Sequence, residues 1–168
     1  MALHIVLFEP EIPQNTGNIA RTCAAIGATL HLVHPLGYSM DEKHLKRAGL
    51  DYWHLLTILE YESVETFLES HKDDNLFFFT TKAHQLYCEV QYPQEAYLIF
   101  GKESAGISES ILVDHEASCV RIPMREEARS LNLSNTAAIA AYEYMRQQQF
   151  PSLLQAGTLH RLSWGEAK

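Results

Sequence analysis

Short apolar runs separated by mixed polar segments recur along the whole chain. The first run, His4 to Phe8, is rich in β-forming residues and ends at a loop that contains Pro10 and Pro13, which predicts a central strand. The same pattern predicts further strands at residues 29–33, 55–59, 76–80, 97–100 and 120–122. Near-continuous apolar strands are typical of a parallel sheet that is covered on both faces.

Helical patterns lie between several of these strands. From Asn15 to Ile26 apolar residues fall on one face, with Asn15 or Thr16 available as a cap and Gly27 in position to end the helix. Further helices are predicted at residues 39–49, 63–70 and 136–146. The first of these opens with the spacing of a capping box.

Strands and helices therefore alternate, which predicts an α/β fold in one domain over residues 1–168. We expect a mostly parallel sheet of about five or six strands covered by helices, with residues 151–168 as a C-terminal tail. The pattern does not determine strand order, and the general expectation for such folds is an un-knotted chain.

Composition supports one core in a reducing compartment. The chain has 168 residues, 46% of them hydrophobic, enough for one core. Its three cysteines, Cys23, Cys88 and Cys119, are far apart and are expected to be small buried residues. No signal peptide or membrane-length apolar run is present, so a cytoplasmic protein with no membrane association is expected.

The nine histidines do not form a metal-binding pattern. His31 and His34 are three residues apart without a carboxylate at ligand spacing, so we interpret them as structural or surface residues. No metal is therefore expected.

Charge has to be considered locally because the net value of -8 is a weak guide to phosphate binding. Lys43, Lys46 and Arg47 form one basic face of the predicted 39–49 helix, although a simply solvated face explains them equally well. Further basic residues lie in or beside two polar loops: Arg21, Arg121, Arg125 and Arg129. This distribution predicts a local cationic surface on an acidic protein.

Two polar loops follow predicted strands in the first half of the chain. Residues 13–21 place Asn15, Asn18 and Arg21 at helical spacing near a helix start, an arrangement suited to a phosphate or a ribose hydroxyl. A capped helix with a solvated arginine explains them equally well. Residues 80–82 are best explained as an ordinary polar strand end.

A third loop, GKESAG at residues 101–106, lacks the spacing of both a nucleophile elbow and a phosphate-binding P-loop. It is interpreted as a glycine turn whose backbone can lie against a flat ligand, with the Glu103 carboxylate at its rim. A plain turn with Glu103 in solvent is the other interpretation.

The fourth loop, residues 122–135, is the most polar. Its hydrogen-bonding side chains are more numerous than one helix cap needs: Ser130, Asn132, Ser134 and Asn135. A polar loop between a strand and a helix is where α/β proteins usually hold ligands. The alanines that follow predict close packing, either inside the chain or against a second subunit.

Three segments carry a resemblance to a known family. PQNTGNIAR at 13–21, LIFGKESAGI at 98–107 and IPMREEARSLNLSNTAAIAAYE at 122–143 resemble the three motifs of the SPOUT methyltransferases, in the correct order. HIVLFEPEIPQNTGNIAR and HPLGYSMDEKHLKRAGLDYW further resemble the members that methylate tRNA ribose. The likeness spans about residues 3–151, while residues 83–96 and the tail depart from it, which leaves the choice of tRNA open.

The resemblance implies a dimeric S-adenosylmethionine enzyme with a C-terminal trefoil knot. The implied substrate is tRNA. The implied product is the 2′-O-methylated wobble nucleotide of leucine tRNAs, which is a cytidine or a modified uridine. It assigns cofactor binding to Phe79, Thr80, Gly101, Glu103, Ile122, Met124, Ser130, Leu131 and Asn132. It assigns catalysis to Arg21, Asn15, Ser134 and Asn135. The local cationic surface predicted from the charges assigns RNA binding to Arg21, Lys43, Lys46, Arg47, Arg125 and Arg129.

Other functions remain open on the sequence. One alternative is a methyltransferase of the same class that acts on ribosomal RNA. It is weakened because the chain starts directly at its first strand, without the RNA-binding extension that many such enzymes carry. A catalytically silent RNA-binding protein of the same fold is opposed by the presence of Arg21 and Glu103. A Rossmann-type oxidoreductase is opposed by the sequence after the first strand, which lacks G-x-G-x-x-G.

Overall fold

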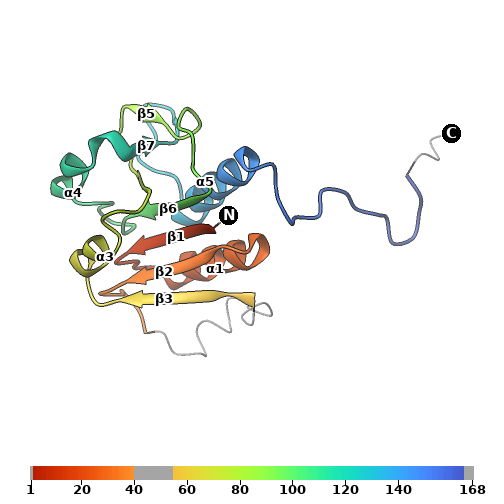
Figure 1. Cartoon of the computed structure of the whole chain (residues 1–168), viewed down its shortest axis with the longest axis horizontal. Helices are drawn as coiled ribbons and strands as arrows, with labels where there is room; N and C mark the ends of the chain where they lie inside the picture. Colours follow the sequence, from red (N-terminus) through yellow and green to blue (C-terminus); the bar gives the residue numbers. More distant parts are fainter. Residues whose placement is uncertain (1, 40–54, 165–168) are drawn as a thin grey trace.

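The computed structural model describes residues 2–39 and 55–164, which form one α/β unit around a seven-stranded, all-parallel sheet (Figure 1). The strand order is β3-β2-β1-β6-β4-β7-β5. The strands are β1 (Ala2–Phe8), β2 (Thr29–Val33), β3 (Thr57–Tyr61), β4 (Leu76–Phe79), β5 (Gln85–Leu86), β6 (Glu95–Phe100) and β7 (Cys119–Arg121).

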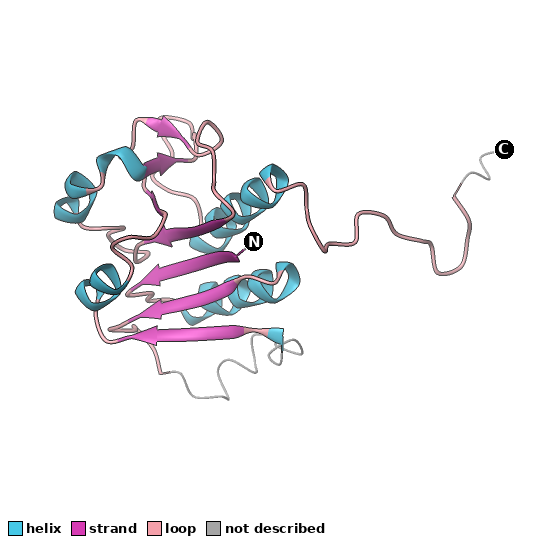
Figure 2. Cartoon of the chain, in the orientation of Figure 1, coloured by secondary structure: helices cyan, strands magenta, loops and turns pink. Residues whose placement is uncertain are grey.

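Helices cover both faces of this sheet (Figure 2). They are α1 (Pro13–Ile26), α3 (Val64–Ser70), α4 (Glu109–Asp114), the 3-10 turn η2 (Glu116–Ser118) and α5 (Leu133–Gln147). α1 and α5 pack on one face in a large apolar cluster, and α3 and α4 pack on the other in a second cluster. β1 supplies both, because alternate side chains of a strand point to opposite faces: Leu3, Ile5 and Leu7 face α1 and α5, while Val6 and Phe8 face the other way.

Most predicted elements are confirmed, including the parallel sheet covered on both faces. α3 begins after the Ser63 cap, whose hydroxyl accepts a hydrogen bond from the Thr66 amide. Gly27 ends α1 in the left-handed conformation, with φ of 72°, which costs glycine little. β3 lies two residues later than predicted and β7 one residue earlier.

The predicted start of α1 is wrong. The helix begins at Pro13 with Ile12 as its N-cap, and no side chain of its own segment caps it. Proline is well suited to the first helical position because its missing N–H would have no partner there. Asn15 and Thr16 are consequently buried inside the first turn instead of capping it.

The sheet has seven strands instead of the five or six expected. The extra strand, β5, is only two residues long and carries no periodicity that could reveal it. The helix α4 was also not predicted. The predicted 39–49 helix, with Lys43, Lys46 and Arg47, falls largely on residues 40–54, outside the described residues.

The topology brings distant segments to one edge of the sheet. β1 lies between β2 and β6, and β4 lies between β6 and β7, so the loops that follow β1, β4, β6 and β7 leave the same edge. From β7 the chain returns to α5, which packs against α1, β6 and β1. Beyond α5 the tail runs away from the body of the protein (Figure 1). Of the helices in the described ranges, none is long and apolar enough to span a bilayer.

Candidate cofactor-binding and active site

A pocket of about 580 Å³ opens at this edge of the sheet. It lies between the loops that follow β4, β6 and β7 and the beginning of α5. All nine residues to which the sequence resemblance assigned cofactor binding line it, together with Asn15. The structure therefore brings three distant segments of the sequence to one cavity.

The inner wall of the pocket is apolar. The rings of Phe79 and Phe100, from the ends of neighbouring strands β4 and β6, stack with centroids 4.9 Å apart. Ile107, Ile122 and Leu131 add aliphatic surface. Flat apolar walls combined with backbone polar groups at strand ends suit a nucleoside-like ligand.

Gly101 is required by the shape of the loop after β6. A Cβ atom at this position would overlap the carbonyl group of Gly106 and the amide nitrogen of Ile107. The loop is closed by a hydrogen bond of 2.8 Å from the Gly106 amide to the Lys102 carbonyl. The predicted glycine turn is thus confirmed. The backbone that lies against Gly101, however, is the Gly106–Ile107 peptide of the same loop.

Glu103 connects this loop to α1. Its carboxylate accepts hydrogen bonds from the Glu11 amide (2.8 Å), the Ile12 amide (3.3 Å) and the side-chain amide of Asn15 (2.9 Å). It therefore supplies the cap that the α1 segment lacks, since a carboxylate near a helix N-terminus satisfies free amides and is favoured by the dipole. A solvent-exposed role for Glu103 is excluded.

A second set of contacts holds the same two loops together. The Glu11 carboxylate accepts hydrogen bonds of 2.9 Å from both the amide and the hydroxyl of Ser104, and these bonds lower the pKa of Glu11. Lys102 pairs with Glu9. The loops after β1 and β6 thus cap each other reciprocally. These roles of Glu11 and Ser104 could not be identified from the sequence, because neither residue belongs to a local pattern.

Asn15 extends this network to the third motif. While its amide group donates to Glu103, its carbonyl oxygen accepts a hydrogen bond of 2.9 Å from Asn132. Asn132 is the N-cap of α5, and its own carbonyl oxygen accepts from the Ser134 amide (2.9 Å), the Ser134 hydroxyl (2.6 Å) and the Asn135 amide (3.3 Å). The oxygen and the nitrogen of both asparagine side-chain amides are therefore held by hydrogen bonds.

Ser134 and Asn135 support this cap and do not line the pocket. Ser134 is buried, while Asn135 is exposed on the first turn of α5. Much of the polar density in the fourth loop is therefore explained by one asparagine that accepts three bonds. Arg21 is exposed on α1, outside the pocket lining.

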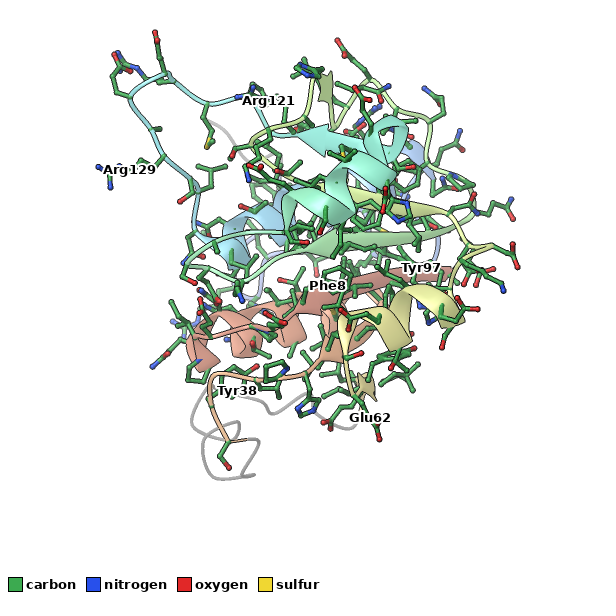
Figure 3. All side chains as sticks on the ribbon, turned by 90° about the vertical axis from the view of Figure 1, so that its left-hand side faces the viewer. Phe8, Tyr38, Glu62, Tyr97, Arg121 and Arg129 are labelled. Atoms are coloured by element: carbon green, nitrogen blue, oxygen red, sulfur yellow. The ribbon has the colours of Figure 1, made fainter. Side chains whose placement is uncertain are left out.

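Basic side chains surround the mouth of the pocket. Arg129 lines it and lies on the loop between β7 and α5, which stands away from the sheet (Figure 3). Arg125, on the same loop, is exposed and lies 3.8 Å from Glu127. Lys82 also lines the pocket and pairs with Glu109 at 3.0 Å. The interpretation of residues 80–82 as an ordinary strand end is therefore wrong, because all three line the cavity.

The ionisable side chains in the described lining of the pocket are Lys82, Lys102, Glu103 and Arg129. Glu103 is the one carboxylate among the described lining residues, and its oxygens are occupied by the α1 cap. Within residues 2–39 and 55–164, no group of three or more His, Cys, Asp or Glu side chains could hold a metal ion.

Cys23 and Cys119 are buried, whereas Cys88 is exposed. The prediction of small buried cysteines is therefore wrong for Cys88, which lies in the irregular segment between β5 and β6.

Comparison with known proteins identifies relatives of the whole fold. Residues 2–142 match the SpoU rRNA Methylase family. The tRNA (cytidine(34)-2'-O)-methyltransferase of Yersinia pestis is 46% identical over 158 residues, which cover 90% of this chain and 98% of that protein.

Two solved structures share the fold. One, determined in work on the 2-OH methylation of C/U34 on tRNA, has a TM-score of 0.82 and 42% identity, covering 88% of this chain and 97% of the other. The SpoU methyltransferase AviRb from Streptomyces viridochromogenes, solved with AdoMet, has a TM-score of 0.76 and 24% identity, covering 88% and 58%. The second likeness shows the fold alone.

Proposed function

Since the chain belongs to the SpoU methylase family, we propose that it methylates the ribose 2′-hydroxyl of nucleotide 34 in tRNA, with S-adenosylmethionine as the methyl donor. The observation that supports this most strongly is the pocket itself. Residues from the three family motifs line one cavity and are joined by hydrogen bonds among Glu103, Asn15 and Asn132. The name of the Yersinia pestis relative, which specifies position 34 and the 2'-oxygen, supports both the proposed nucleotide and the proposed site of methylation on its ribose.

The residues of the pocket fit the proposed cofactor. Phe79, Phe100, Ile122 and Leu131 offer apolar surface for a nucleoside, and the strand ends and the turn at Ser130 and Leu131 offer backbone groups. When bound, S-adenosylmethionine supplies an electrophilic methyl group on a sulfonium centre. The chain's part is to orient the ligand and to exclude water from it.

Positioning is expected to dominate the rate. A ribose 2′-hydroxyl is a poor nucleophile at neutral pH, and holding it in line lowers a barrier by about 7 to 11 kcal/mol. A general base typically adds only about 10² to 10⁴-fold. The network that fixes Asn15, Ser134 and Asn135 serves this positioning by holding the starts of α1 and α5 together.

Arg21 is the proposed electrostatic group. A guanidinium has a pKa above about 12 and does not serve as a base, so we assign Arg21 to the developing alkoxide or to a neighbouring phosphate. Because Arg21 is exposed on α1 and outside the pocket lining, it acts on the RNA side of the reaction and not on the cofactor.

tRNA is the proposed partner, with leucine tRNAs as the expected acceptors. Arg125 and Arg129 on the projecting loop supply phosphate contacts near the pocket mouth, and Lys43, Lys46 and Arg47 are proposed to extend this surface. We further propose a cytoplasmic homodimer with the trefoil knot implied by the family. Exposed Ile139 and Tyr142 on α5 support a second subunit.

Ribosomal RNA is the second candidate substrate, because the matching family takes its name from ribosomal RNA methylation. Incubation with labelled S-adenosylmethionine and separate tRNA and ribosomal RNA pools distinguishes the two. We expect label in tRNA alone. Label confined to ribosomal RNA would replace the proposed substrate, and cofactor binding without transfer to either pool would favour a catalytically silent RNA-binding protein.

A further inference from the structure

A connected series of polar side chains crosses the face of the sheet that α3 covers. His4 Nδ1 lies 2.8 Å from His31 Nε2, and His31 Nδ1 lies 3.1 Å from the Tyr61 hydroxyl. That hydroxyl lies 2.9 Å from His71 Nε2, and His71 Nδ1 lies 2.7 Å from the Asp74 carboxylate. We call these five residues the histidine chain. It shares no residue with the described lining of the pocket.

The middle of the histidine chain is buried and its ends reach solvent. His31 is 1% exposed. The Asp74 side chain at one end is 39% exposed. At the other end, His4 Nε2 lies 3.6 Å from the carboxylate of Glu95, whose side chain is 60% exposed. The chain therefore runs from one solvated carboxylate to another through the protein interior.

Aromatic packing fixes the rings in place. Tyr97 of β6 stacks on His4 with centroids 4.1 Å apart and planes within 8°. Phe67 of α3 lies 4.5 Å from the ring of His71 and 6.0 Å from that of His31. Tyr97 and α3 lie on the same side of the protein in Figure 3. These contacts leave little freedom for the imidazoles to turn away from their partners.

The contacts determine where each proton lies when the chain is neutral. Because Asp74 only accepts, His71 carries its proton on Nδ1, and its Nε2 accepts from the Tyr61 hydroxyl. The Tyr61 oxygen then accepts from His31 Nδ1, and His31 Nε2 accepts from His4 Nδ1. His4 Nε2 then carries no proton and can only accept a hydrogen bond. Among the described residues this atom is buried without a hydrogen-bond partner.

One added proton completes a second arrangement. A proton that arrives at His4 Nε2 faces Glu95, and His4 can pass its Nδ1 proton to His31 Nε2. His31 then passes its Nδ1 proton to Tyr61, and Tyr61 passes its own to His71 Nε2. The result is a His71 imidazolium beside Asp74, with one proton gained overall. The bonds from His4 to His31, from His31 to Tyr61 and from Tyr61 to His71 are reversed, and the bond from His71 to Asp74 is kept. Both arrangements satisfy all four internal hydrogen bonds.

We propose that the histidine chain is a proton relay that holds one exchangeable proton, so that β1, β2, β3 and α3 switch together between two hydrogen-bonded states as pH changes. The three histidines take up one proton between them instead of three. The added charge resides at an end of the chain, beside Glu95 or Asp74, and the buried middle stays neutral in both states.

The electrostatics agree with this geometry. Burial lowers the pKa of His4, and burial together with His4 and His71 lowers the pKa of His31 to about 3. Tyr97, the other titratable ring against His4, has its pKa raised to about 12 by burial and neighbouring carboxylates, so it stays neutral. His71 is also the C-cap of α3, where a positive charge is favoured by the helix dipole.

Nitrogen-15 NMR of the histidine rings in the full chain tests the proposal. At about pH 8 we expect His4, His31 and His71 all to carry their proton on Nδ1, the less common neutral form. On titration to about pH 4.5 the three should gain one proton in total, and His31 should move its proton to Nε2 without becoming charged. His84 and His160, which are exposed and lie outside the histidine chain, serve as internal references.

Tyr61→Phe removes the link between His31 and His71 and should abolish the movement of the His31 proton. His34→Gln is the matched control, since His34 pairs with Glu60 beside the chain and outside it. If Tyr61→Phe fails to fold, Asp74→Asn, at a half-exposed end, should equally abolish the movement. Any one of three results would overturn the relay. They are three separate protonations of the histidines, an Nε2 proton on His31 at about pH 8, and movement of the His31 proton that persists in these variants.

Discussion

Asn15 and Asn132 stand 117 positions apart in the sequence, yet their side-chain amides share a hydrogen bond of 2.9 Å. Because Asn15 also donates to Glu103 and Asn132 caps α5, this one bond connects the capped starts of α1 and α5. The pocket is built on that connection, since all three residues line it. Together with the bond from Asn15 to Glu103, the bond between Asn15 and Asn132 joins side chains of all three motifs.

The first prediction concerns this bond. Asn132→Ala removes the α5 cap and should lower the free energy of unfolding by about 1 kcal/mol. Asn15→Ala removes the hydrogen bonds that Asn15 makes to Glu103 and Asn132. In a double-mutant cycle measured by urea unfolding, the two should show a coupling energy of about 0.5 to 3 kcal/mol. Asn18→Ala, exposed on the same helix, is the control, and strict additivity of Asn15→Ala and Asn132→Ala would contradict the network.

The second prediction concerns Glu103. Glu103→Gln keeps one accepting oxygen and replaces the other with a donor, so it cannot accept from both backbone amides and Asn15. We expect a loss of about 1 to 2 kcal/mol in unfolding free energy and weaker binding of S-adenosylhomocysteine by calorimetry. Glu109→Gln, which breaks an exposed pair with Lys82, should change the unfolding free energy by less than about 0.5 kcal/mol. Equal effects of the two variants would argue against the cap.

The third prediction concerns Gly101. Gly101→Ala places a methyl group on the Gly106–Ile107 peptide, so the loop must open and both stability and cofactor affinity should fall. Gly157→Ala is the matched control, because its Cβ would meet nothing within 4 Å. Thermal unfolding and calorimetric titration measure the two effects. Unchanged affinity in Gly101→Ala would show that the loop does not shape the pocket.

Much of this arrangement could be predicted from the sequence, because it rests on local patterns. Apolar runs located the strands, Ser63 and Gly27 marked helix ends, and the motif resemblance identified the pocket residues. The role of Glu103 could not be predicted, since its partners lie about ninety positions away and a turn carboxylate has the same local pattern whether solvated or capping. The histidine chain could not be predicted either, because its members come from three strands and from the turn that follows α3, and partners on neighbouring strands lie 27 and 30 positions apart.

The fourth prediction is a loss of stability in acid. Burial lowers the pKa of His31 to about 3, so between the unfolded pKa of about 6.5 and the folded value the unfolded chain binds the extra proton. Stability from this group is complete above about pH 6.5 and falls by up to about 1.4 kcal/mol per pH unit below it. Urea unfolding of wild type and His31→Gln measures the slope. An identical slope in both would contradict the assignment.

The fifth prediction separates chemistry from cofactor binding. Arg21→Lys should retain calorimetric affinity for S-adenosylhomocysteine, since Arg21 lies outside the pocket lining. It should lose most methyl transfer, because a lysine ammonium lacks the planar fork of a guanidinium. Single-turnover assays with saturating cofactor measure the difference. Near-normal transfer by Arg21→Lys would remove this role from Arg21.

The most direct test locates the methyl group in the product. Leucine tRNA lacking the modification is incubated with the protein and isotope-labelled S-adenosylmethionine, digested, and analysed by mass spectrometry. We predict a single label on the ribose of nucleotide 34, the position named for the Yersinia pestis relative. A methyl group at this 2′-oxygen should also block alkaline cleavage after that nucleotide. A label on a base, or on a ribose at another position, would contradict the proposed function.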